Sequence, residues 1–101
     1  MDPDLPDNMN ISDVVVSTAG RDRGDWFYVI DEDPVYLMLA NGKDRTLDKP
    51  KRKKRKHIQK VLRSETRVAE KLRLGDKVLN SELRRDLAYL SREMQGSNLG
   101  G

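Results

Sequence analysis

The chain of 101 residues has no cysteine and a single histidine, so it offers neither a disulfide framework nor a thiolate metal site. It has no apolar run long enough to span a bilayer. The N-terminus is acidic rather than basic and then apolar, so no signal peptide is predicted. We therefore expect a soluble cytoplasmic protein that does not associate with membranes.

Aromatic residues make up only 5% of the chain and charged residues 37%, so the apolar residues must be concentrated to form a core. Most of the strand-like sequence falls between residues 14 and 47. A sheet of that size is marginal alone and needs cover from other elements. The length allows one domain at most.

Short runs of β-branched and aromatic residues predict strands over 13–17, 26–30 and 35–40. Gly20 and Gly24 close the first turn, because glycine adopts positive φ without strain. The Asn41-Gly42 pair is typical of a tight hairpin turn, and a short fourth strand is expected over 43–48.

Two helices are expected after the sheet. The first covers about 64–74 and is ended by Gly75 as a C-cap. The second begins near Asn80 or Ser81, which are suitable N-caps. Its apolar stripe consists of Leu83, Leu87 and Leu90. We expect this stripe to cover the sheet; a partner-binding or dimerisation face is the alternative.

The positive charge is strongly segregated along the chain. Residues 43–63 hold eleven basic and two acidic side chains, a local net charge of +9, although the whole chain carries only +3. Such a segment is typical of a surface that binds nucleic acid or another polyanion. A solvated charged linker is the alternative interpretation.

Two segments carry a family resemblance. The sequence DVVVSTAGRDRG at 13–24 resembles the KOW motif, found in large-subunit ribosomal proteins and transcription-elongation factors. The sequence LDKPKRKKRKHI at 47–58 resembles the proline-then-lysine tract of a small bacterial branch similar to the eukaryotic and archaeal KOW-type ribosomal proteins. The resemblance implies a mainly β fold with C-terminal α structure: an SH3-like small β-barrel of the KOW type followed by a helix pair. It also implies RNA, ribosomal RNA in particular, as ligand.

The expected organisation has four parts. They are an acidic disordered tail (1–12), a KOW-type barrel (13–60) with a basic arm (49–57), a helical C-terminal segment (61–95) and a flexible tail (96–101).

The RNA contacts are expected from the basic arm and the first turn, because lysine neutralises phosphates and the planar guanidinium of arginine grips them bidentately. The arm is expected to be disordered when free and ordered on RNA. Two alternatives stand: the turn arginines pair with Asp22 and Asp25, and the arm is a nuclear localisation signal. The predicted RNA-binding residues are Arg21, Arg23, Lys49, Lys51, Arg52, Lys53, Lys54, Arg55, Lys56 and His57.

Trp26 and Tyr28 share one strand face opposite Phe27. Trp26 is the candidate for base stacking, although core packing of both faces is the favoured interpretation. Tyr36 is expected to partner the second strand.

Nothing in the sequence supplies a nucleophile with its base, and a lone histidine cannot build a metal site. The acidic residues at 31–33 indicate a solvated turn rather than a magnesium site. No catalysis, metal or cofactor is therefore expected.

The predicted function is that of a non-catalytic RNA-binding protein, ribosomal or ribosome-associated and monomeric when free, with ribosomal RNA and ribosomal proteins as partners. The alternative is a protein-interaction module that docks a ribosomal or transcription partner through the barrel or the leucine face.

Overall fold

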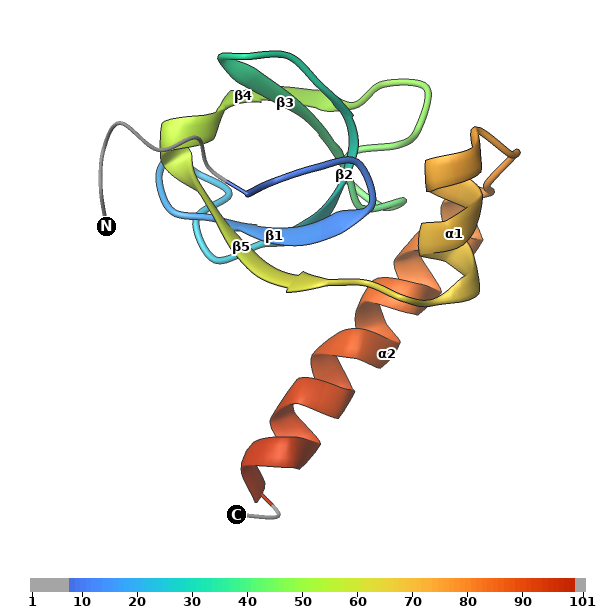
Figure 1. Cartoon of the computed structure of the whole chain (residues 1–101). Coiled ribbons are helices and arrows are strands. Elements are labelled where there is room, and N and C mark those ends of the chain that lie inside the picture. The colour runs from blue at the N-terminus through green and yellow to red at the C-terminus, as the bar shows by residue number, and fades with distance from the viewer. Residues whose placement is uncertain (1–7, 100–101) are drawn as a thin grey trace.

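The computed structural model describes residues 8–99, which form a curved antiparallel sheet followed by two helices (Figure 1). The strands are β1 (Asp13–Ser17), β2 (Trp26–Glu32), β3 (Tyr36–Ala40), β4 (Lys51–Lys54) and β5 (Ile58–Arg63). A single 3₁₀ turn, η1 (Arg55–His57), joins the last two strands. The helices are α1 (Arg67–Leu74) and α2 (Asn80–Leu99).

The strand order is β4-β3-β2-β1-β5, so β4 and β5 form the two edges. A small β-rich domain with C-terminal helices is therefore confirmed. The sheet does not close into a barrel, although η1 links its two edge strands in sequence.

Both faces of the sheet are buried, and the alternation of side chains along β2 separates two cores. Phe27 and Val29 pack on one face with Val15, Leu37 and other apolar residues. Tyr28 lies on the opposite face, against the two helices. The predicted opposition of these aromatic side chains is confirmed. The helices contribute Val68, Ala69, Leu83 and Leu87 to the second core, so the leucine stripe does cover the sheet.

The strand predicted over 43–48 is wrong, because this segment is a loop. The Oδ1 atom of Asn41 accepts hydrogen bonds from the backbone N–H groups of Lys43 and Arg45, at 2.9 and 3.0 Å, which turns the chain away from β3. The partner of β3 is instead β4, with Tyr36 opposite Lys54 and Leu39 opposite Lys51.

The helical boundaries are partly as predicted. Helix α1 begins after Thr66, whose Oγ1 accepts from the N–H of Ala69, and ends at Gly75 with φ of 74°. Helix α2 begins at Asn80 as predicted but continues to Leu99, so a tail beginning at residue 96 is wrong. Residues 61–63, predicted to be helical, belong to β5, which pairs with β1.

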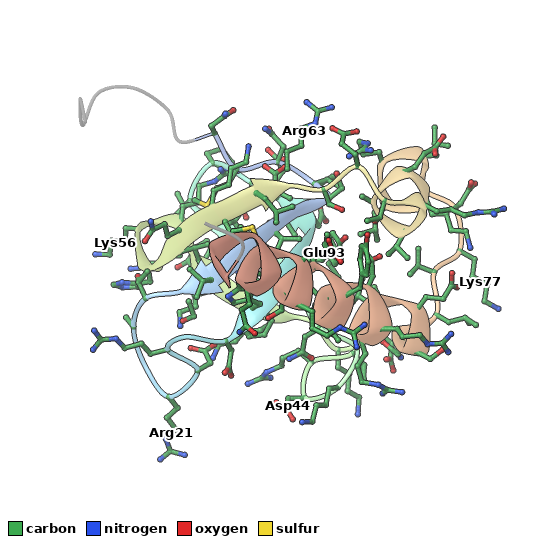
Figure 2. All side chains as sticks on the ribbon, turned by 90° about the horizontal axis from the view of Figure 1, so that it is seen from below. Arg21, Asp44, Lys56, Arg63, Lys77 and Glu93 are labelled. Carbon is green, nitrogen blue, oxygen red and sulfur yellow. The ribbon has the colours of Figure 1, made fainter. Side chains whose placement is uncertain are left out.

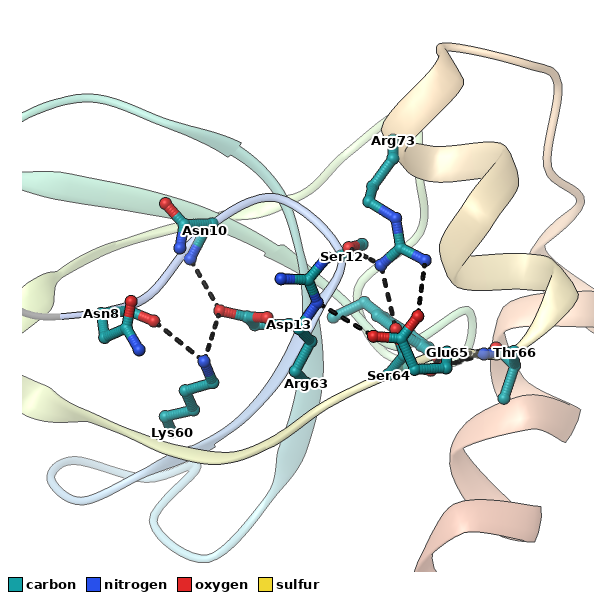
Figure 3. A network of polar contacts seen from close by, with 11 residues as sticks. Asn8, Asn10, Ser12, Asp13, Lys60, Arg63, Ser64, Glu65, Thr66 and Arg73 are labelled. Carbon is teal, nitrogen blue, oxygen red and sulfur yellow. Dashed lines mark hydrogen bonds and ion pairs between the residues drawn. The ribbon is translucent and has the colours of Figure 1, made fainter.

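Residues 8–12 are packed against the domain rather than forming part of a tail; residues 1–7 lie outside the described part. Met9 is only 4% exposed and joins the core around Phe27. The N–H of Ser12 donates to the carbonyl oxygen of Val29 at 2.8 Å. Asp13 accepts from the N–H of Asn10 and lies 3.4 Å from the Nζ of Lys60, which also reaches the carbonyl of Asn8 (Figure 3).

A second polar cluster in Figure 3 joins this N-terminal segment to α1. The guanidinium of Arg73 donates to the Oγ of Ser12 at 2.8 Å and to the carbonyl oxygen of Ser64 at 2.9 Å. Glu65 pairs with both Arg73 and Arg63. These contacts fix the first helix against the start of β1.

We expect Gly42→Ala to destabilise the domain by at least about 2 kcal/mol, because a Cβ there would lie 2.2 Å from the carbonyl oxygen of Asn80 and the residue has φ of +77°. Gly24→Ala is the matched control: φ is +91° but nothing lies within 4 Å, so only about 1 kcal/mol of backbone strain is expected. Urea unfolding measures both. Equal losses of unfolding free energy in the two variants would show that the close approach of α2 to Gly42 is unimportant.

Candidate nucleic-acid interface

The loop that joins β1 to β2 is a defined turn. Gly20 and Gly24 both have positive φ, 84° and 91°, as predicted. The N–H of Gly24 donates to the carbonyl oxygen of Ser17 at 2.8 Å. Arg21 and Arg23, which lie between the glycines, are exposed and make no ion pair within residues 8–99. The alternative in which these arginines pair with Asp22 and Asp25 is therefore not observed.

Asp22 instead bonds to β4. The residue is only 8% exposed. Its Oδ2 lies 2.7 Å from the Nζ of Lys51, and its Oδ1 accepts from Lys53 and, at 2.8 Å, from the Oγ of Ser17. The Nζ of Lys53 also donates to Ser17 Oγ and to the carbonyl oxygen of Ala19. Asp22 therefore holds the turn against the basic strand.

The carboxylate of Asp22 is ionised. Burial by itself raises its pKa. The hydrogen bonds from Lys51, Lys53 and Ser17 together lower the pKa by more than burial raises it, so the pKa lies well below its ordinary value. Two ammonium groups that are themselves largely buried share this one negative charge.

Alternation along β4 explains why a strand made only of basic residues is ordered. The two lysines that contact Asp22 occupy alternate positions, and Arg52 and Lys54 occupy the others, which are exposed. The expectation that the basic arm is disordered when free is wrong, because β4 pairs with β3 and two of its four cations contact the carboxylate of Asp22.

Arg55 also makes internal contacts. Its guanidinium reaches Glu32 at 3.2 Å, and it donates to the carbonyl oxygens of Asp33 and Met9. His57 is half-buried, and its carbonyl oxygen accepts from the N–H of Thr18 at 2.9 Å. These two predicted RNA-binding residues therefore hold the arm in place.

The remaining predicted contact residues of the turn and the arm are exposed. Figure 2 shows Arg21 and Lys56 pointing from the ribbon into solvent. The structure brings the turn and the arm together through Asp22. We call the following set the outward cations: Arg21, Arg23, Lys49, Arg52, Lys54 and Lys56.

The two aromatic residues considered for surface roles lie in different environments. Trp26 is half-buried against the core beneath the helices. The ring of Tyr36 lies under Arg52, whose guanidinium carbon is 3.7 Å from the ring centroid. Tyr36 lies on β3, which pairs with both β2 and β4; it is opposite Lys54 of β4, and its carbonyl oxygen accepts from the N–H of Asp33, just after β2, at 2.9 Å. The role of Asp22 was also missed, although its position between two turn glycines was visible in the sequence.

Residues 8–99 contain no cluster of three or more histidine or acidic side chains arranged to hold a metal ion. In the same part of the chain, neither helix combines the length and apolar composition needed to cross a bilayer. No protein family model and no curated protein sequence matches the chain. The KOW resemblance therefore stays a prediction.

Asp22→Asn is expected to lower the free energy of unfolding by about 3 kcal/mol, because it leaves two largely buried ammonium groups without their counter-charge. Asp25→Asn, at an exposed neighbouring position, should change it by less than about 0.5 kcal/mol. Urea unfolding at neutral pH measures both variants. A similar small loss for both would contradict the role of Asp22.

The free energy of unfolding should also depend on pH. Since the pKa of Asp22 is lowered on folding from an ordinary value of 3.8, its contribution is complete above that value and is lost as the pH falls towards the folded pKa. The difference in unfolding free energy between the wild-type protein and Asp22→Asn should therefore narrow below about pH 4. Unfolding curves recorded between pH 2 and 7 test this; a constant difference would contradict it.

Proposed function

We propose that this protein is a non-catalytic RNA-binding protein that contacts ribosomal RNA as a ribosomal or ribosome-associated component. The observation that carries the proposal is the set of outward cations, gathered from the β1–β2 turn and the basic arm and without ion pairs in the described part. A KOW-type SH3-like barrel is the fold we propose for it, since the antiparallel strand order and the η1 connection are compatible with one.

Phosphate contacts account for the proposed affinity. Arg52 and Lys54 lie two residues apart on β4, which spaces their backbones by roughly 6–7 Å along the strand. Each phosphate neutralised on single-stranded RNA contributes about −0.7 to the slope of log affinity against log salt. Six outward cations therefore set an upper limit of about −4 for that slope.

A solvated linker is a poor account of this segment, because its inward lysines and Arg55 have defined partners and hold the exposed residues on a folded surface. Binding through phosphates positions the RNA and gives little sequence preference. The absence of catalysis stays a prediction.

The alternative function is docking of a ribosomal or transcription partner protein. It is favoured by the exposed apolar side chains where α1 turns into α2: Leu74 is 68% exposed and Leu79 51%. These residues lie outside the set of outward cations, so substitutions can separate the two functions.

We expect the triple variant Lys49→Gln, Lys54→Gln and Lys56→Gln to weaken RNA binding and to make the salt slope shallower by about 2, because three phosphate contacts are lost. The matched control removes three exposed cations elsewhere: Lys43→Gln, Arg67→Gln and Lys77→Gln. Fluorescence anisotropy with a single-stranded RNA from 50 to 300 mM salt measures the slopes. Equal effects of the two triples would mean that net charge alone matters.

The ribosomal role is tested by co-sedimentation of both triple variants and the wild-type protein with ribosomes across the same salt series. Retention of the wild-type protein and the control on the large subunit, with loss of the first triple, is the expected result. Retention of all three would favour docking through the apolar surface.

A further inference from the structure

We propose that Arg52 and Tyr36 form a stacking platform for an unpaired RNA base, so that the ligand presents at least one single-stranded nucleotide to the outer face of β3 and β4. This inference rests on the proposed RNA-binding function and narrows it to a class of ligand. The platform is distinct from the phosphate contacts, because it requires a flat surface rather than a charge.

The stack lies on the side of the sheet edge that faces away from Asp22. Arg52 is opposite Met38 in the β3–β4 ladder, and Tyr36 is opposite Lys54, so Arg52 and Tyr36 are diagonal neighbours on one face. The guanidinium carbon lies 3.7 Å from the centroid of the tyrosine ring. This distance is that of a cation–π contact.

The base of the platform is held in place by Asp33. The N–H of Asp33 donates to the carbonyl oxygen of Tyr36 at 2.9 Å. In return, its Oδ1 accepts from the N–H groups of Tyr36 and Val35, at 2.7 and 2.8 Å. Both backbone polar groups of Tyr36 are thereby bonded to one residue, which fixes the backbone that carries the ring.

The upper layer of the platform is available to a ligand. Arg52 is exposed, and its guanidinium makes no hydrogen bond or ion pair within residues 8–99. One face of that group covers Tyr36, which leaves the other face for a base and the N–H groups for a phosphate or a base edge. Lys54, exposed and opposite Tyr36, adds a charge for the backbone of the same strand.

A purely structural role for the contact is the competing account, but the four residue pairs of the β3–β4 ladder already join these strands. Trp26 does not offer an equivalent surface, because it packs against the core beneath the helices. An unpaired base fits the platform better than a duplex does, since the faces of paired bases are covered by their neighbours in the stack.

The test is Arg52→Lys, which keeps the charge and removes the planar group. Its affinity is compared with that of the wild-type protein by anisotropy, using a 12-nucleotide single-stranded RNA and a duplex of the same length. We expect a loss of at least about fivefold on the single strand and less than twofold on the duplex, with an unchanged salt slope. Arg23→Lys makes the same exchange at the turn and should affect both RNAs equally.

A second pair of variants tests whether the aromatic ring of Tyr36 is needed for binding. Tyr36→Phe keeps it and should bind the single strand like the wild-type protein, whereas Tyr36→Leu should lose affinity as Arg52→Lys does; circular dichroism establishes that each variant is folded. Equal losses on both RNAs, or no loss for Arg52→Lys, would overturn the platform while leaving RNA binding intact. Failure of the wild-type protein to bind either RNA would instead overturn the proposed function, and the platform with it.

Discussion

The carboxylate of Asp22, held between the ammonium groups of Lys51 and Lys53, is the interaction on which the candidate interface depends. A strand composed only of basic residues repels itself, and this one buried anion contacts two of its four cations and neutralises one unit of their charge. The same contact ties the β1–β2 turn to an edge strand far away in sequence, so the turn arginines are placed beside the arm. Pairing with β3 orders the backbone of β4, and backbone hydrogen bonds shape the turn; the Asp22 contact adds the link between the two.

A period of two residues organises both the core and the surface. Along β2 it sends Phe27 to one core and Tyr28 to the other, where the Tyr28 hydroxyl hydrogen bonds with Ser64 and Asp86. Burial, and then the hydrogen bond to Asp86, raise the pKa of this tyrosine far above its ordinary value, so it remains a neutral donor that ties the sheet to α2. Along β4 the same period sorts identical charges into structural and exposed groups, which composition alone cannot do.

The sequence predicted the elements whose formation depends on near neighbours. The first three strands follow from β-branched and aromatic runs, and the end of α1 at Gly75 follows from a capping preference. The predictions were wrong where the structure of a segment depends on residues that are distant in the sequence. Strand β4 pairs with β3 and places two lysines against Asp22, the loop at 43–48 is held through Leu47 by the side chain of Asn80, and Met9 is buried by residues of the sheet. Among the predicted contact residues of β4, the alternation of side chains along the strand determines which are exposed. The sequence did not predict a strand there, so it could not predict this alternation.

For the proposed RNA binding, a folded arm differs energetically from a flexible tail. A disordered basic tract loses conformational entropy when it is ordered on its ligand, whereas β4 has already lost that entropy on folding. Fewer phosphate contacts then suffice for a given affinity, and the exposed residues keep a fixed spacing relative to the Arg52–Tyr36 stack.

The charges on β4 also have a second effect, on association between sheet edges. An edge strand with unpaired backbone groups invites the addition of another strand, and lysine and arginine side chains on β4 oppose that association. The charges proposed to bind RNA thus also discourage pairing with a second copy of the same edge.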